Sequence, residues 1–499
     1  MKSNENIIAS VDLGSNSFRL QIYHCHHEQW QIVDSIKEMV QLAAGLDAKK
    51  NLNKDVQERA LACLARFGER LRGLKARQVR AVATNTFRVM NNLQPFLSKA
   101  EKALGFPIEI IAGREEARLI YTGVVHTVPF NQQRALIIDI GGGSTEFVIG
   151  AQEQPEITES LALGCVSYSM RFFAGDKVSA SSFRNAVNSA RSEIQRIAGG
   201  LKNISWDFAI GTSGSARAIR DVTMTTHPAE ENIRYEHMQT LAKRITQAGG
   251  TRKARLEGLR PDRIEVFAGG LAVMMAAFEE LAIADMTVTD AALRDGVFYD
   301  LIGRHLDQDM RDETIAQFQL RYHVDLAQAM RVEAVALRCL NGLAMQMSRQ
   351  ELRYWQTFVS WAARVHEIGL SIAHTGYHKH SAYILEQADM PGFSRKDQKV
   401  LATLVLGHRG DLKKMREALD NPLLCSAIIC LRLAALFCRA RADIVFPEQT
   451  SLQVNAAKKK CVLSISREWL NANPLSANAL DFETFAWDKV GHQFIVKAL

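Results

Sequence analysis

The sequence has no closely spaced pair of cysteines. Its eight cysteines are scattered, and no two of them form a Cys-x-x-Cys motif. Structural zinc sites usually take thiolates from such pairs, and disulfide frameworks are typical of short secreted chains rather than of a chain of 499 residues. The cysteine pattern therefore argues against a structural zinc site and against a disulfide framework.

The sequence also has no long uncharged apolar run and no apolar leader. The opening residues, MKSNENIIASVDLG, reach the first predicted strand almost at once, which leaves no room for a signal peptide. Because a helix needs about 20 mainly apolar residues to cross a bilayer, we expect no membrane insertion. These absences predict a cytoplasmic protein, with peripheral association with a membrane left open.

The composition lacks the features of a disordered chain. Apolar residues make up 47% of the sequence and charged residues 23%, as in ordinary globular proteins. The net charge of +7 suits a polyanionic partner, although a solvated basic surface explains it equally well. The chain is too long for one hydrophobic core, and its length favours about three or four domains.

The most informative stretch is 136–150, LIIDIGGGSTEFVIG. A short apolar run ends at three glycines and a second one follows Ser-Thr-Glu, which predicts strand, tight turn and strand. Because glycine has no Cβ, such a turn can bring backbone N–H groups close to an anion. Asp139 and Glu146 flank the turn and would place oxygen ligands for Mg²⁺ beside a phosphate. The alternative is a hairpin whose glycines only make the turn.

A second stretch near the N-terminus has the same organisation. The apolar strand 7–11 is followed by Asp12-Leu-Gly-Ser-Asn-Ser17 and then by a strand with alternating apolar residues. The two hairpins resemble the phosphate-binding loops of the actin, hexokinase and Hsp70 superfamily. In that superfamily, two ribonuclease-H-like lobes close over a phosphate chain.

Further motifs narrow the resemblance. They are Gly45-Leu46, Ala83-Thr-Asn-Thr-Phe-Arg88, Gly113-Arg-Glu-Glu-Ala-Arg-Leu119, Gly211-Thr-Ser-Gly214 and Ala292-Leu-Arg-Asp-Gly296. Together they resemble the exopolyphosphatase and guanosine pentaphosphate phosphohydrolase family (Ppx/GppA), over essentially the whole chain. The resemblance implies hydrolysis of a terminal phosphoanhydride by direct attack of water.

The resemblance also implies catalytic roles. The second member of the glutamate pair, Glu116, would polarise the attacking water, and Glu115 is the second candidate. Arg88 would offset charge on the transferred phosphoryl group; it follows a short buried strand, and open α/β sheets place their ligand sites at strand ends. Taken alone, two acids at a helix start would simply complement the helix dipole.

Three carboxylates and several loop residues are expected to bind the metal and the phosphates. Asp139, with Asp12 and Glu146, would hold Mg²⁺ or Mn²⁺. Arg294 would touch phosphate, or would merely pair with Asp290. The expected phosphate contacts are Ser15, Asn16, Ser17, Gly141, Gly142, Gly143, Ser144, Thr145, Gly211, Ser213 and Arg294.

The predicted fold is α/β, with ribonuclease-H-like lobes at 1–129 and 130–305. Strand patterns then vanish and amphipathic helices follow, which resembles an all-α HD-like domain over 306–445; a small α+β cap closes the chain at 446–499. An HD metal site needs a His-Asp dyad, and this sequence has His366-Glu367. We therefore expect a structural relic rather than a second active site.

The resemblance leaves two substrates open. Inorganic polyphosphate is the first prediction, because basic residues in the helical half, such as Lys396, Lys399, Lys413 and Lys414, favour an extended channel. The alternative is pppGpp, which loses its 5′ γ-phosphate to give ppGpp. We expect a homodimer and no specific nucleic acid partner. A sugar or acetate kinase, and a non-catalytic actin-type scaffold, fit the Glu115-Glu116 helix start less well.

Overall fold

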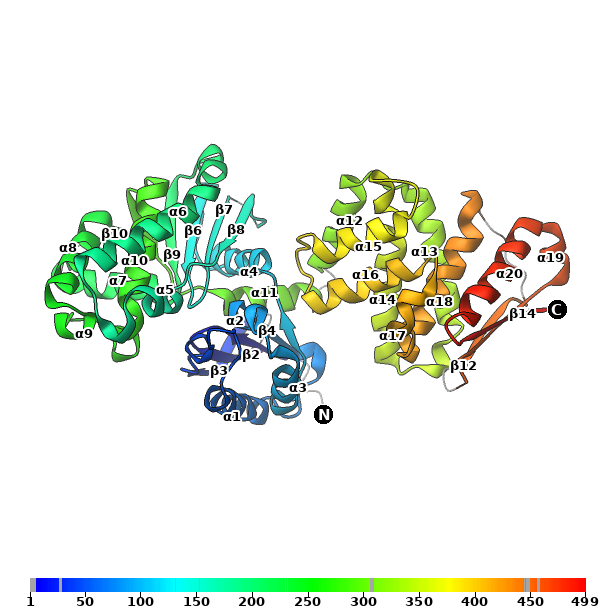
Figure 1. Cartoon of the computed structure of the whole chain (residues 1–499), viewed down its shortest axis with the longest axis horizontal. Coiled ribbons are helices and arrows are strands. Elements are labelled where there is room, and N and C mark those ends of the chain that lie inside the picture. Colours follow the sequence, from blue (N-terminus) through cyan, green and yellow to red (C-terminus); the bar gives the residue numbers. More distant parts are fainter. Residues whose placement is uncertain are drawn as a thin grey trace. The chain divides into compact units, whose positions relative to one another are not determined.

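The computed structural model describes residues 6–26, 29–130, 132–151, 153–228, 230, 232–305, 309–443, 445, 449–455 and 458–499. The chain divides into two compact units, Met1–Asp309 and Met310–Leu499 (Figure 1). The first unit contains two α/β lobes, and the second contains helices and a small sheet. Residues 306 and 446, where the sequence predicts the helical domain and the cap to begin, lie outside the described residues.

Lobe I is a five-stranded mixed sheet covered by helices. Its elements are β1 Ile7–Leu13, β2 Phe18–His26, β3 Gln29–Glu38, α1 Lys54–Arg70, β4 Val79–Ala83, α2 Asn85–Val89, α3 Leu93–Leu104, β5 Ile108–Ile110 and α4 Gly113–Val125. The strand order is β3-β2-β1-β4-β5, and β1 pairs antiparallel with β2 and parallel with β4. Because side chains alternate along a strand, Val11 packs toward α1 and α3, whereas Ile8 faces the opposite side of the sheet. The predicted first hairpin is present.

Lobe II repeats the plan on a six-stranded sheet of order β10-β11-β9-β6-β7-β8. Its elements are β6 Ala135–Ile140, β7 Thr145–Gly150, β8 Ile157–Leu161, α5 Cys165–Phe172, α6 Ala180–Ile204, β9 Phe208–Thr212, α7 Ser213–Thr226, β10 Ile233–Arg234, α8 Tyr235–Ala248, α9 Thr251–Ala254, α10 Ile264–Leu281, β11 Asp285–Val288 and α11 Leu293–His305. Strands β6 and β7 form the predicted glycine hairpin, closed by the pair Ile140 and Thr145. Helix α11 returns to lobe I, where Phe298 packs with Ile8 and Tyr23.

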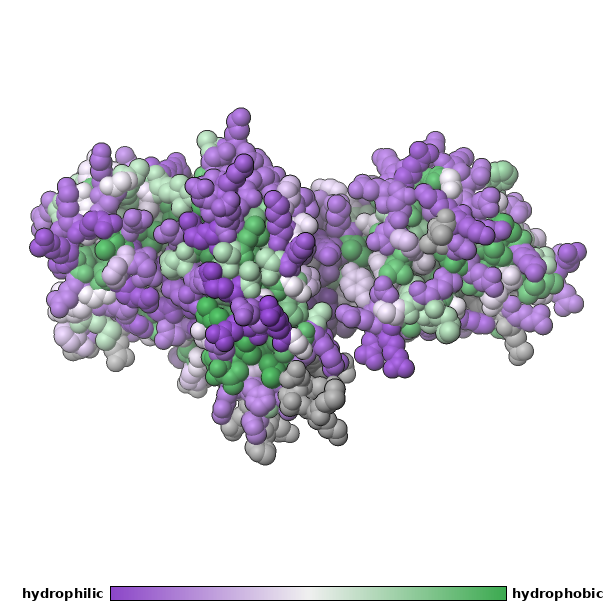
Figure 2. All heavy atoms as spheres, turned by 90° about the horizontal axis from the view of Figure 1, so that it is seen from below, coloured by the Kyte–Doolittle hydropathy of each residue, from purple (hydrophilic) through white to green (hydrophobic). Residues whose placement is uncertain are grey.

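The second unit is a helical bundle that continues into a three-stranded sheet. Its elements are α12 Met310–Arg321, α13 Leu326–Asn341, α14 Arg349–Val365, α15 Tyr377–Gln387, α16 Arg395–Gly407, α17 Arg416–Leu419, α18 Pro422–Phe437, β12 Ser451–Asn455, β13 Lys460–Ile465, α19 Arg467–Ala472, α20 Pro474–Asp488 and β14 Gln493–Ala498. One apolar cluster runs from α12 to β14, so helices and sheet share a single core. On the face drawn in Figure 2, hydrophilic residues predominate and apolar residues form separate patches.

Helix α18 is an exception to the expectation that no segment is long and apolar enough to cross a membrane. By length and composition, Pro422–Ala440 passes that test, with a mean hydropathy of 2.0. In the structure, 72% of the most apolar 18-residue stretch of this segment is buried inside the protein. Its Arg432 is also buried and pairs with Glu483 of α20. The helix therefore serves as the centre of the second unit's core.

The His366-Glu367 dyad lies beside two further histidines. The imidazole rings of His366 and His408 are 5.1 Å apart, and His378 lies 6.2 Å from His408. In both His366 and His408, Nδ1 lies within hydrogen-bond distance of a backbone carbonyl. Burial lowers the pKa of all three imidazoles, that of His378 to about 4. Within the described residues, no three His, Cys, Asp or Glu side chains are placed to hold a metal ion.

We expect the second unit to lose stability as pH falls from about 6.5 toward 4. Each buried histidine stays neutral in the folded state, while its unfolded counterpart is protonated below its ordinary pKa. Each such histidine lowers the free energy of unfolding by up to about 1.4 kcal/mol for every pH unit of acidification. Tryptophan fluorescence during urea unfolding measures this, because Trp355, Trp361, Trp469 and Trp487 lie in this unit.

A matched pair of variants isolates the contribution. His408→Asn should flatten the dependence of the urea midpoint on pH, because it removes one buried imidazole. His374→Asn, at an exposed position on the same unit, should leave it unchanged. An identical pH dependence in native protein and His408→Asn would exclude His408 as a cause.

Candidate active site

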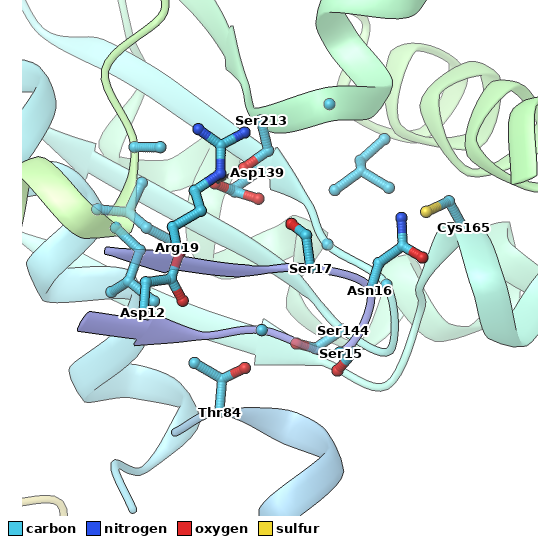
Figure 3. Close-up of a pocket in the computed structure, with 18 of the residues that line it drawn as sticks. Asp12, Ser15, Asn16, Ser17, Arg19, Thr84, Asp139, Ser144, Cys165 and Ser213 are labelled. Carbon is cyan, nitrogen blue, oxygen red and sulfur yellow. Dashed lines mark hydrogen bonds between the residues drawn. The ribbon is translucent and has the colours of Figure 1, made fainter. Parts of the chain in front are cut away.

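The two glycine hairpins face each other across one pocket in the first unit (Figure 3). Residues 14–17 come from the β1–β2 turn and 141–144 from the β6–β7 turn. A Cβ at Gly142 would lie 2.9 Å from Ser15 Cβ, and one at Gly164 would lie 2.1 Å from the Gly142 carbonyl oxygen. Only glycine allows the loops to approach this closely, which explains the glycine at position 142.

The two loops present donors to the pocket. Their turns are closed by Gly14 N–H donating to Ser17 O at 3.2 Å and Gly141 N–H donating to Ser144 O at 2.9 Å. Within the described residues, the backbone amides of Asn16 and Gly142, which line the pocket, donate to no acceptor, and the buried side-chain nitrogen Nδ2 of Asn16 has no partner either. Converging N–H groups of this kind form an anion-binding concavity.

Carboxylates lie beside these donors. Asp12 and Asp139 line the pocket, and Ser213 Oγ donates to Asp139 Oδ2 at 2.7 Å. Burial, with neighbouring carboxylates adding to it, raises the pKa of Asp12 to about 7 and that of Asp139 to about 6. Ser213 has a left-handed φ of 65°, a strained conformation typical of functional sites.

The donor set fits a divalent cation of the Mg²⁺ type. The Oδ1 atom of Asp12 is buried without a hydrogen-bond partner among the described residues. No three acidic, histidine or cysteine side chains in that part of the chain converge enough to hold a metal by themselves. Mg²⁺ usually binds through one or two carboxylates and completes its octahedron with water and substrate phosphates. Asp12 and Asp139 could therefore hold the ion together with a phosphate chain.

Glu146, the third predicted metal ligand, is placed differently. It pairs across the hairpin with Asp139, but it is buried and does not line the pocket. Ser160 Oγ donates to its Oε1 at 2.9 Å. Burial and the nearby charges of Glu116 and Asp139 raise its pKa well above the usual range. Its position suits support of Asp139 better than direct metal contact.

Glu116 lines the pocket near the first turn of α4, as the sequence predicts. Arg88 Nη1 donates to its Oε2 at 2.9 Å and to the carbonyl of Ile111 at 2.9 Å. Burial raises the pKa of Glu116, while Arg88 opposes that rise. Arg88 is not among the pocket-lining residues. Arg88 therefore pairs with Glu116 in this structure, and its expected contact with the transferred phosphoryl group stays a prediction.

Glu115 belongs to a buried ion-pair cluster and does not line the pocket. Arg118 donates to both of its carboxylate oxygens at 2.8 Å and also pairs with Asp300 of α11 at 2.5 Å. Arg80 of β4 joins the cluster through Asp300. Consecutive helix residues point about 100° apart, so Glu115 holds α4 against α11 and β4 while Glu116 turns to the cleft. This placement is at odds with the expected role of Glu115 as an alternative base.

Eight of the eleven predicted phosphate contacts line the pocket, and three do not. Ser15, Asn16, Ser17, Gly141, Gly142, Ser144, Ser213 and Arg294 line it, while Gly143, Thr145 and Gly211 do not. Thr145 Oγ1 donates to the Leu163 carbonyl, and a Cβ at Gly211 would meet Met286 Sδ at 2.8 Å. These three residues therefore contact other parts of the fold rather than the pocket. Arg294 pairs with Asp295 and with the Asp290 carbonyl, and its buried Nε has no partner within the described residues.

The sequence did not predict three arginines that line the pocket: Arg19, Arg217 and Arg263. Arg19 lies opposite Asp12 in the β1–β2 pair, so strand register offered a signal for it. Arg217 follows the 211–214 turn by less than one helical turn, whereas nothing around Arg263 marks it. Burial and the neighbouring guanidiniums lower the pKa of Arg19 to about 10. Together with Arg294 they give the pocket a strongly cationic wall.

A second cavity of about 350 Å³ adjoins the pocket and shares Arg19, Arg217 and Arg263 with it. We call it the basic annex. Its two acids are already engaged, since Asp290 pairs with Arg217 at 3.0 Å and Asp221 with Arg220 at 2.8 Å. The cationic residues that line it are Arg19, Lys37, Arg217, Arg220, Arg260 and Arg263. The annex therefore suits a further anionic group of the molecule bound in the pocket.

Comparisons with known proteins identify a family for this chain. Residues 21–305 match the sequence profile of the Ppx/GppA phosphatase family, and 310–484 match that of Ppx/GppA phosphatase, domain III. A guanosine-5'-triphosphate,3'-diphosphate pyrophosphatase of Pseudoalteromonas translucida is 37% identical over 499 residues, which cover 99% of each chain.

Solved structures show the same fold. An exopolyphosphatase from Cytophaga hutchinsonii is 23% identical, covers 60% of this chain and 98% of its own, and superposes with a TM-score of 0.54. A Ppx/GppA family member from Aquifex aeolicus is 22% identical with the same coverage and a TM-score of 0.51. Both therefore share the fold of about three fifths of this chain.

We expect Asp139→Asn to weaken binding of Mn²⁺, because the amide removes one anionic ligand. Even outer-shell partners of a metal site contribute about 10- to 100-fold in affinity, and a direct ligand should contribute at least as much. Electron paramagnetic resonance of free Mn²⁺ during titration, with pyrophosphate present, measures the change without reference to turnover. Asp55→Asn, at an exposed position of α1, is the control, and equal affinity in both variants would remove Asp139 from the metal site.

Proposed function

Because the chain belongs to the Ppx/GppA phosphatase family, we propose that it hydrolyses the terminal 5′ phosphoanhydride of pppGpp, releasing orthophosphate and ppGpp. The observation that carries this proposal is the basic annex beside the phosphate pocket. A molecule with phosphates at two ends of a nucleoside would place its 5′ triphosphate in the pocket and its 3′ diphosphate in the annex. The relative that is 37% identical over the full chain bears the name of that activity.

The mechanism follows from how the pocket residues are placed. The loop amides and the arginine wall would hold the terminal phosphoryl group, since phosphoryl transfer depends mainly on positioning and charge neutralisation. Asp12 and Asp139 would hold Mg²⁺ or Mn²⁺, which supplies further neutralisation of the phosphate oxygens when bound. Glu116 would accept the proton of the attacking water, and its raised pKa suits a base that works near neutral pH.

Inorganic polyphosphate is the second candidate, although the basic residues of the helical half led the sequence analysis to put it first. The pocket and the annex form a continuous cationic lining, which would also accept consecutive phosphates of a linear chain. The two candidates differ in that pppGpp carries a second phosphate group, the 3′ diphosphate, which the cations of the annex could bind. The name of the similar full-length relative also supports pppGpp. Both substrates require the same chemistry at Glu116.

We expect Glu116→Gln to reduce kcat by about 10² to 10⁴, because the amide keeps the shape of the side chain and loses its basicity. Orthophosphate release from pppGpp and from polyphosphate measures the effect, and binding should change little. Glu156→Gln, which removes only an exposed carboxylate paired with Arg134, is the matched control. Turnover of Glu116→Gln within about twofold of the native enzyme would exclude Glu116 as the base.

We expect Arg220→Gln to raise KM for pppGpp by about fivefold, the upper end for a partly exposed ion pair, and to change KM for tripolyphosphate less. Arg220 lines the annex but not the pocket, so only a substrate that reaches the annex should sense it. Arg196→Gln, on the exposed face of α6, is the control. A kcat/KM for long polyphosphate well above that for pppGpp, with equal sensitivity of all substrates to Arg220→Gln, would favour polyphosphate instead.

A further inference from the structure

Lys37 occupies an unusual place in the annex. It lies on β3 directly opposite Arg19 of β2, so two cations face each other across an antiparallel pair. Like charges at such positions repel. The closest acid is Asp262, whose Oδ2 is 3.7 Å from Lys37 Nζ, and Asp262 also pairs with Arg260 at 3.2 Å. The counter-charge available to the lysine is therefore shared.

This setting makes the amine reactive. Burial, and then the charges of Arg19 and Arg263, lower the pKa of Lys37 to about 8. A lysine beside other cations carries more of the neutral amine near physiological pH and is a better nucleophile. One quarter of the side chain remains exposed, and Lys37 lines the annex, so a small molecule that enters the annex meets this side chain.

The lining of the annex adds an anchor for a phosphate group. Arg217, Arg220 and Arg260 surround the same cavity as Lys37, and a guanidinium is well suited to bind phosphate. A small reagent that carries a phosphate and an electrophilic carbon would thus be held with its carbon near Nζ. Acyl phosphates are a chemical class with these two features, and they also transfer an acyl group to an amine with orthophosphate as the leaving group.

We propose that Lys37 is a site of acylation by small acyl phosphates, with acetyl phosphate as the simplest example. The neutral Nζ attacks the acyl carbon, and the bond from that carbon to the bridging oxygen breaks. Orthophosphate leaves with the electron pair, and the amine loses one proton to solvent. The products are an amide at Lys37 and orthophosphate, with no change of oxidation state.

The modification would alter the annex without touching the catalytic pocket. Acylation removes the positive charge of Lys37, which lowers the attraction of the annex for an anionic group. The residues that line the pocket itself, including Glu116 and Asp139, do not include Lys37. Acylation therefore couples the supply of activated acyl groups to substrate affinity at this enzyme.

The test compares lysines within the full-length native protein. The chain is incubated with acetyl phosphate near pH 8, and acetylation at each lysine is followed over time by mass spectrometry. Lys99, exposed on α3 of the same lobe, is the internal reference. We expect Lys37 to react at least about tenfold faster than Lys99, because a lower pKa gives it more free amine. Equal rates at the two lysines would overturn the proposal.

Two controls separate the phosphate anchor from intrinsic reactivity. Pyrophosphate should slow acetylation of Lys37 by acetyl phosphate and leave Lys99 unaffected. Arg220→Gln should slow it with acetyl phosphate but not with acetic anhydride, which carries no phosphate; circular dichroism confirms that the variant folds. If neither pyrophosphate nor Arg220→Gln changes the rate at which acetyl phosphate acetylates Lys37, the annex does not direct the reagent. That result would also overturn the proposal.

Discussion

The cleft depends on charges of both signs that are buried close together. Asp12, Asp139 and Glu116 share one pocket with four arginines, and burial raises the pKa of each of these carboxyls. Burying an ionised carboxylate is costly unless a partner compensates. Such a constellation favours a ligand that also carries both signs, namely a phosphate chain with a divalent cation. The glycine loops complete it, because their close approach brings backbone donors to the same point.

A separate network of buried charges fixes the positions of the helices that carry residues into the pocket. Glu115, Arg118, Arg80 and Asp300 are buried together and tie α4 to α11 and to the lobe I sheet. Breaking a buried pair leaves an uncompensated charge, so the cluster resists displacement of either helix. The ends of those two helices carry Glu116 and Arg294 into the pocket. One residue of the glutamate pair thus holds the helices together, and the next lines the pocket.

The residues that we propose for catalysis and those that we propose for substrate choice line two adjoining cavities. The loops, the carboxylates and Glu116 form a centre that any terminal phosphoanhydride could use. Selectivity would come from the annex, where Lys37, Arg220 and Arg260 lie outside the catalytic pocket. Burial lowers the pKa of Lys37, and the neighbouring Arg19 and Arg263, which also line the annex, lower it further.

Local sequence determined the two glycine hairpins, the α/β lobes and the helical second unit, because strand alternation, turn glycines and helix periodicity act over a few residues. The hairpin pattern singled out Asp12 and Asp139, and the family resemblance singled out Glu116; all three line the pocket. Only the tertiary structure decided that Glu115 and Glu146 do not line the pocket, that Arg88 pairs with Glu116, and that Arg263 lines the pocket together with Arg19. These outcomes depend on which faces of distant elements meet, and the direction of a side chain across such a contact leaves no periodic trace in the sequence.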